Sequence, residues 1–200
     1  MPPITFLPAD QATTTTALTS ARQAIRQVLR AIGEDPDREG LLDTPDRVIK
    51  SWGELFAGYG QEPAEILSTT FGEVGGYDEM VLLRDIPFQS TCEHHMLPFI
   101  GKAHVAYLPG QRVVGLSKLA RLVECFARRL QIQERLTSEV ADAIMEHLEP
   151  AGCGVVVEAG HGCMACRGVR KEGATMVTSS LRGEFKAPAT RAEFLGLIRG

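Results

Sequence analysis

Two short clusters of cysteine and histidine carry the clearest chemistry in this sequence. The first is the segment 92–95, CEHH, in which Cys92 and His95 have the C-x2-H spacing that lets both side chains reach one ion from a tight turn. The second is the segment 161–167, HGCMACR, which adds further thiol and imidazole groups. Thiolate and imidazole ligands together select zinc over magnesium or calcium. The two clusters therefore predict one zinc site built from distant parts of the chain.

The number of ligands decides what such a site can do. Four protein ligands close a zinc site and make it structural, whereas three leave a position for water and make it catalytic. The closed set would be Cys92, His95, Cys163 and Cys166, and the open set would be Cys92, His95 and Cys163. The C-x2-C spacing of Cys163 and Cys166 supports the closed set. His94 and His161 favour the open set, because histidines beside a metal-bound water suit proton transfer near neutral pH.

Several basic residues could form a pocket for a polyphosphate. Lys118 and Arg121 are three residues apart and could share a helix face, with Ser117 beside them. Arg167 follows the second cluster, and Arg47 lies in the first turns of a predicted helix. Each could equally belong to a solvated charged face. The sequence contains no G-x-x-x-x-G-K-[ST] motif, so a nucleotide here would not be bound by a P-loop.

A carboxylate at the start of a predicted helix could recognise a purine base. Gln133 and Glu134 open this helix. A carboxylate there could accept hydrogen bonds from the N–H edge of guanine. It could equally be an acid that interacts favourably with the helix dipole.

Hydrophobic periodicity predicts the elements that must position these residues. We expect strands over 80–91, 100–108, 154–159 and 175–180, and helices over 18–32, 44–57, 116–129, 133–148 and 189–198. This order predicts an α+β fold, in which a four-stranded antiparallel sheet carries two helices on one face and follows a helical N-terminal arm. A sheet covered on one face leaves its other face and its edges open, which favours an oligomer.

Length and composition indicate how the chain is organised. We expect a flexible tail over 1–17, the helical arm over 18–75 and a catalytic domain over 76–200. The net charge of −4 argues against a protein built around nucleic acid. Five cysteines in a chain of 200 residues favour metal or thiol chemistry in a reducing compartment over a disulfide scaffold. The sequence shows neither a signal peptide nor a membrane span, so we expect a cytoplasmic protein without a membrane partner.

Several long motifs, in this order and spacing, closely resemble GTP cyclohydrolase I. They are STCEHHMLPFIGKAHVAYLP at 90–109, GLSKLARLVECFARRLQIQERLT at 115–137 and HGCMACRGVRK at 161–171, flanked by TPDRV at 44–48 and TSSLRGEF at 178–185. The resemblance covers about residues 20 to 198. It implies a tunnelling fold, in which subunit sheets join into rings and two rings stack, usually as a homodecamer that is a pentamer of dimers.

The resemblance also implies a reaction and a set of roles. Zinc-activated water would open the guanine imidazole ring of GTP at C8, release formate and give 7,8-dihydroneopterin triphosphate, the first step of tetrahydrofolate biosynthesis. The roles by position would be zinc on Cys92, His95 and Cys163; acid–base chemistry by His94 and His161; the ribose near Ser117; guanine on Gln133 and Glu134; and the triphosphate on Lys118, Arg121, Arg167 and, from a neighbouring subunit, Arg47. Zinc lowers the pKa of its bound water to roughly 7, which suits this chemistry. Cys166 would be a spare thiol, a redox liability, or a fourth ligand in a resting state without substrate.

Overall fold

The computed structural model of this chain describes residues 11–72 and 76–199. The chain forms two compact units, residues 1–60 and residues 61–200. This division falls before the predicted start of the catalytic domain at residue 76. Within the described ranges, no helix combines the length and the apolar character that crossing a bilayer requires.

The first unit is helical. Its elements are α1 Gln11–Ala31, η1 Glu39–Leu41, α2 Thr44–Leu55 and η2 Ala57–Gly60. The Arg22 guanidinium links α1 to α2 through a 2.5 Å contact with the Asp46 carboxylate. Helix α1 begins at Gln11, so the predicted tail end at residue 17 lies inside the helix. The threonines at 13–16 do not prevent this, because threonine disfavours a helix by less than about 1 kcal/mol per residue. The predicted tail's residues 1–10 lie outside the described residues.

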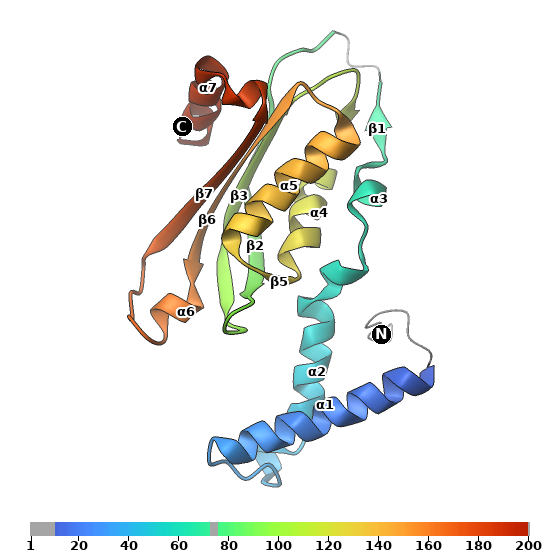
Figure 1. Cartoon of the computed structure of the whole chain (residues 1–200), viewed down its shortest axis with the longest axis vertical. Helices are drawn as coiled ribbons and strands as arrows, with labels where there is room; N and C mark the ends of the chain where they lie inside the picture. Colours follow the sequence, from blue (N-terminus) through green and yellow to red (C-terminus); the bar gives the residue numbers. More distant parts are fainter. Residues whose placement is uncertain (1–10, 73–75, 200) are drawn as a thin grey trace. The chain divides into compact units, whose positions relative to one another are not determined.

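The second unit is built on a five-stranded sheet (Figure 1). Its order is β5-β2-β3-β6-β7, and the strands are β2 Val81–Cys92, β3 Pro98–Leu108, β5 Leu130–Gln131, β6 Gly152–His161 and β7 Thr175–Gly183. The four long strands are antiparallel, as predicted. The predicted count of four is wrong, because β5 adds a short parallel edge beside Thr91 and Cys92. Two residues are too few to show a strand periodicity. A separate two-stranded sheet pairs β1 Thr70–Phe71 with β4 Val113–Val114, and α3 Pro63–Leu67 precedes it.

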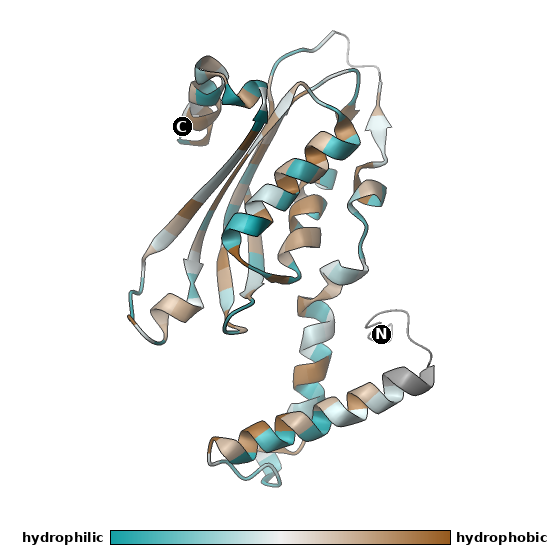
Figure 2. Ribbon diagram, viewed as in Figure 1, coloured by the Kyte–Doolittle hydropathy of each residue, from teal (hydrophilic) through white to brown (hydrophobic). Residues whose placement is uncertain are grey.

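Two helices cover one face of the sheet, as the sequence predicts. They are α4 Leu116–Ala127 and α5 Gln133–Leu148. Figure 2 shows hydrophobic and hydrophilic residues alternating along α5, as expected for a helix with one buried face. Leu119 and Leu122 of α4 and Leu136 and Ile144 of α5 are fully buried in the main core. Each contributes about 1.5–3 kcal/mol relative to an exposed side chain, so this layer is the main support of the sheet.

The other face of the sheet is covered in part. Helix α7 Pro188–Arg199 and the short η3 Glu184–Lys186 bring Phe194 and Phe185 against Ala106 and Val156, and the two phenyl rings meet edge to face with centroids 5.3 Å apart. The sequence pattern predicts a helix over 189–198, but it does not indicate which face of the sheet that helix covers. Farther along the sheet, Ile100 of β3 and Val177 of β7 are 57% and 60% exposed.

A buried histidine lies where β2 bulges. The register of β2 against β3 shifts between Leu83 and Ile86, and Asp85 adopts a φ of 58° there. The backbone N–H of Asp85 donates to Nδ1 of His104, whose side chain is buried. His104 therefore satisfies a backbone donor that the bulge removes from the strand ladder.

Acid should weaken the fold through His104. Burial lowers the pKa of His104 below its ordinary value; Asp85 and Glu158 oppose this shift, whereas Lys102 and Arg84 add to it. The unfolded chain therefore binds this proton first, and stability is lost as the pH falls below about 6.5. In His104→Gln the amide oxygen can still accept from Asp85 but does not titrate. We expect urea unfolding between about pH 7 and pH 5 to show a smaller loss of free energy in this variant than in the parent. Equal losses would contradict the assignment.

Candidate metal centre

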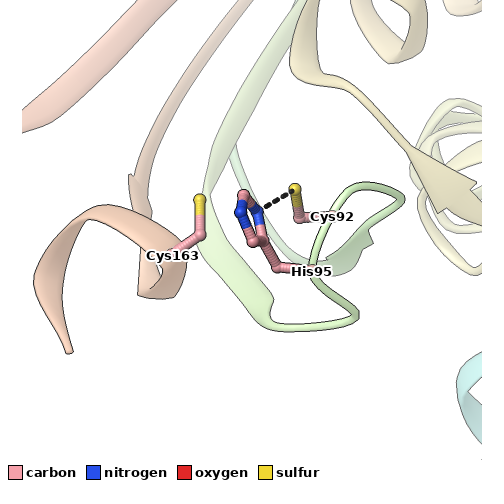
Figure 3. A group of neighbouring side chains, drawn as sticks. All are labelled: Cys92, His95 and Cys163. Atoms are coloured by element: carbon pink, nitrogen blue, oxygen red, sulfur yellow. Dashed lines mark hydrogen bonds between the residues drawn. The ribbon is translucent and has the colours of Figure 1, made fainter. Parts of the chain in front are cut away.

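Three side chains from distant segments meet at one end of the sheet. Cys92 is the last residue of β2, His95 lies in the following turn, and Cys163 belongs to the short helix α6 Gly162–Ala165 after β6. Their ligand atoms all lie within 4.8 Å of one another. Figure 3 shows the three side chains converging, with Cys92 Sγ 3.9 Å from His95 Nδ1. Two sulfurs and an imidazole nitrogen suit zinc, and this group could hold one metal ion.

Backbone hydrogen bonds shape the turn that carries Cys92 and His95. The N–H of Cys92 donates to the carbonyl of Leu97 at 2.9 Å, and the N–H of Met96 donates to the carbonyl of Cys92 at 2.8 Å. Met96 has a φ of 53°, which reverses the chain within a few residues. The turn leads directly into β3, so the two ligands lie between the end of β2 and the start of β3.

Strand pairing brings Cys163 to this turn. In the register of β3 and β6, Phe99 lies opposite His161, so the residues after β6 lie beside those before β3. Gly162 is closely apposed to the turn, because a Cβ there would lie 2.8 Å from the carbonyl oxygen of Pro98. A larger residue would force the two segments apart and move Cys163 away from the other ligands.

The electrostatics of the group favour a bound cation. Burial, followed by the nearby Cys92 sulfur, raises the pKa of the Cys163 thiol. Two thiolates at this separation repel each other, and a metal ion between them would remove that penalty. Cys166 is exposed and is not a member of the three-residue group.

His161 is held firmly beside the ligands. Its ring stacks on Phe99, with centroids 4.7 Å apart and an interplanar angle of 3°. Its Nε2 lies 2.8 Å from Oε1 of Gln133. Burial lowers the pKa of His161, and the charge of Glu134 partly opposes this. His94, in contrast, is exposed and has a 3.8 Å contact with Glu93.

The side chain of Gln133 points into the protein. It is 1% exposed, and its amide nitrogen lies 3.0 Å from the carbonyls of Val157 and Met176 and 3.2 Å from Oγ1 of Thr178. With Oε1 bonded to His161, both ends of the amide are in use. The neighbouring Glu134 is exposed in the first turn of α5.

The basic residues of the predicted pocket are only partly brought together. Arg167 Nη1 lies 3.0 Å from Nε2 of His95, at the metal centre. Ser117, Lys118 and Arg121 lie on α4, and their side chains form no hydrogen bond or ion pair with any residue in the described ranges. Arg47 lies on α2 of the first unit and pairs with Asp43 at 3.1 Å.

Sequence reasoning missed two contributors to this centre. Phe99 supplies the stacking surface for His161, and the strand register opposite residue 161 is the signal that could have found it. Arg135 donates to Glu93, inside the ligand turn, and this lowers the pKa of Glu93. A cation in the first turn of a helix opposes the helix dipole, so the presence of Arg135 there could have indicated an acidic partner outside the helix.

The architecture and the site together define a class: an α+β protein with a cysteine–histidine centre able to hold a metal ion at the end of its sheet. The sequence comparisons agree on one family. The GTP cyclohydrolase I profile matches residues 21–199. GTP cyclohydrolase 1 of Allorhizobium ampelinum is 60% identical over 166 residues, 83% of each chain. GTP cyclohydrolase 1 of Brucella abortus is 54% identical over 201 residues, 98% of this chain and 94% of that relative.

The chain belongs to the GTP cyclohydrolase I family, and its function is that of a GTP cyclohydrolase. Among solved structures, the apo form of the archaeosine synthase QueF-Like aligns with a TM-score of 0.44 and 16% identity, over 52% of this chain and 93% of that chain.

The close approach at Gly162 can be tested against a neighbouring glycine. Gly162→Ala places a methyl group against the Pro98 carbonyl, so we expect several-fold weaker binding of Zn²⁺ in a chelator competition assay. Gly160→Ala is the matched control, because a Cβ there meets nothing within 4 Å. Equal zinc affinity in the two variants would show that this apposition does not position Cys163.

Proposed function

We propose that this GTP cyclohydrolase is zinc-dependent, with Cys92, His95 and Cys163 as the three protein ligands. The observation that carries this is the convergence of their ligand atoms within 4.8 Å, without Cys166. Bound zinc would supply a Lewis acid that lowers the pKa of a water molecule to roughly 7, for attack at C8 of the guanine ring. Ring opening would release formate and give 7,8-dihydroneopterin triphosphate.

His161 would exchange the protons of this reaction, and Gln133 would set its tautomer. The Gln133 amide nitrogen donates to backbone carbonyls, so its oxygen faces His161 and accepts from Nε2–H. The proton of neutral His161 is therefore on Nε2, which leaves Nδ1 as the nitrogen that takes a proton from water and delivers it to N7 of guanine. The exposed His94 would serve as the second acid–base group.

GTP would be held by side chains of α4, α5 and the segment after α6, together with one from a neighbouring subunit. Glu134 is exposed at the start of α5 and would accept hydrogen bonds from the N–H edge of guanine, whereas Gln133 beside it would act through His161. Ser117 would contact the ribose. The cations that would bind the triphosphate are Lys118, Arg121, Arg167 and, from a neighbouring subunit, Arg47.

Metal binding would also free Arg167. A guanidinium can donate hydrogen bonds and cannot accept them, so Nε2 of His95 must carry a lone pair to bond Arg167. If His95 binds metal through Nε2, that lone pair is used. If it binds through Nδ1, Nε2 must carry the proton. In either case the Arg167 contact is lost, and the guanidinium becomes available to phosphate.

The remaining parts of this proposal concern the oligomeric state, the cellular location and the pathway of the enzyme. We infer a tunnelling fold, in which sheets of neighbouring subunits join, and a homodecamer built as a pentamer of dimers. The exposed Ile100 and Val177, on the partly covered face of the sheet, support burial against further chains. We place the enzyme in the cytoplasm, at the first step of tetrahydrofolate biosynthesis.

The three-ligand site predicts a clear difference between two cysteines. Cys163→Ser should lose bound zinc and the formation of formate and pterin from GTP, because the third ligand is removed. Cys166→Ala should keep one zinc per chain and turnover close to the parent. The measurements are zinc content after dialysis and pterin fluorescence after oxidation. Loss of zinc in both variants would favour a closed, four-ligand structural site.

The separate roles of Gln133 and Glu134 predict different kinetic changes. Gln133→Met removes the bond to His161, and we expect kcat to fall on the order of tenfold or more, with KM for GTP little changed. Glu134→Gln removes a guanine contact and should raise KM. If Gln133→Met instead raised KM as Glu134→Gln does, the Gln133 side chain would belong to the guanine site.

A further inference from the structure

The side chain of Arg135 links three segments around the metal centre. Its Nε donates to Oε1 of Gln131 at 2.9 Å, and its Nη2 donates both to the carbonyl of Leu130 at 3.0 Å and to the carboxylate of Glu93. Arg135 lies in the first turn of α5, its partners Leu130 and Gln131 form β5, and its partner Glu93 lies in the ligand turn. One guanidinium therefore joins a helix, a sheet edge and the turn that carries Cys92.

The position of Arg135 in its helix makes this link unusual. Residues 133 to 135 form the first turn of α5, where the dipole favours an acid over a cation. The carboxylate of Glu93 offsets that penalty from outside the helix. A guanidinium with three partners in two other segments fixes an orientation more strictly than a single surface ion pair.

The second anchor of the turn runs along the same path. The N–H of Glu93 donates to the carbonyl of Gln131 at 3.0 Å. Gln131 is itself buried, and its amide nitrogen lies 3.1 Å from the carbonyl of Phe126 and 2.7 Å from Oε2 of Glu139. The backbone of Glu93 therefore bonds β5, where Gln131 is buried, and its side chain bonds Arg135, which also contacts β5.

We propose that Arg135 and Glu93 form a positioning pair that holds the metal-ligand turn at a fixed spacing from the first turn of α5. Glu93 lies between Cys92 and His94, so a shift of its side chain moves a ligand on one side and a proposed acid–base group on the other. The helix turn presents Gln133 and Glu134. The pair would therefore set the distance between the metal and the bound guanine.

The pair has consequences for both metal and substrate. Groups that orient metal ligands from outside the coordination sphere typically change metal affinity 10- to 100-fold when they are removed. A misplaced reacting centre lowers kcat more than substrate binding. This inference rests on the proposed zinc site, and zinc affinity is a readout of positioning that does not require turnover.

The test compares Arg135, which lies on α5, with Arg182, which lies on β7 and bonds residues of α5. Arg135→Gln should raise the dissociation constant for Zn²⁺ about 10- to 100-fold in anaerobic competition with a chromophoric chelator, and should lower kcat more than it changes KM. Arg182 is the matched control: its guanidinium also forks, to Asp142 of α5, to the Leu181 carbonyl and to Ser138. Arg182→Gln should change zinc affinity by no more than about twofold.

Two further variants keep the test decisive if Arg135→Gln folds poorly. Glu93→Gln breaks the same link from the turn, and Arg135→Lys restores the charge without the fork. We expect Glu93→Gln to weaken zinc binding as Arg135→Gln does. The double variant, Glu93→Gln with Arg135→Gln, should weaken it little further. The zinc affinity of Arg135→Lys should lie between those of the parent and Arg135→Gln.

The outcomes separate this inference from the proposed function. If the parent binds zinc and Cys163→Ser does not, but Arg135→Gln and Glu93→Gln match Arg182→Gln in zinc affinity, the positioning pair is refuted and the metal site stands. If the parent itself fails to bind zinc, both the metal assignment and the positioning pair are overturned.

Discussion

The pairing of β3 with β2 on one side and β6 on the other is the constraint on which the metal centre depends. Cys92 and Cys163 are far apart in the sequence, and neither segment could hold an ion by itself. The register that places Phe99 opposite His161 brings the residues after β6 against the turn before β3. A slip of one residue would turn His161 to the opposite face of the sheet and separate it from Gln133 and Phe99.

Packing on α4 and α5 keeps this register in place. The buried side chains of both helices rest on the same face as Val105, Val155 and Val157 of the central strands. At the start of α5, where an unsatisfied polar group would be costly, Gln133 bonds the β6 and β7 backbone, and Thr137 lies 2.6 Å from Thr178. The helix is thus fixed to the sheet by polar contacts at the end where the site lies and by apolar contacts along its length.

Residue types and local spacing were enough to predict part of this site. The grouping of Cys92, His95 and Cys163 could be predicted because thiol and imidazole clusters at the ends of strands have few other uses, and the four long strands followed from their periodicity. The burial of Gln133 could not be predicted, because its partners come from β6 and β7, which lie far along the chain. The fifth strand and the face that α7 covers also depend on tertiary packing and leave no local pattern.

The chemistry of His95 would link a metal bound at this centre to the rest of the site. Two thiol groups and a nearby guanidinium surround one imidazole, and only one of its nitrogens lies beside Arg167. Because arginine stays protonated and only donates, the state of His95 that binds metal is incompatible with the state that binds Arg167. In the proposed zinc site, a cation at the cysteines would therefore do two things at once: it would stabilise the paired thiolates, and it would release a positive side chain at the edge of the centre. An anionic substrate would then meet a free guanidinium in the metal-loaded protein, and this would couple the proposed phosphate binding to metal binding through a single histidine.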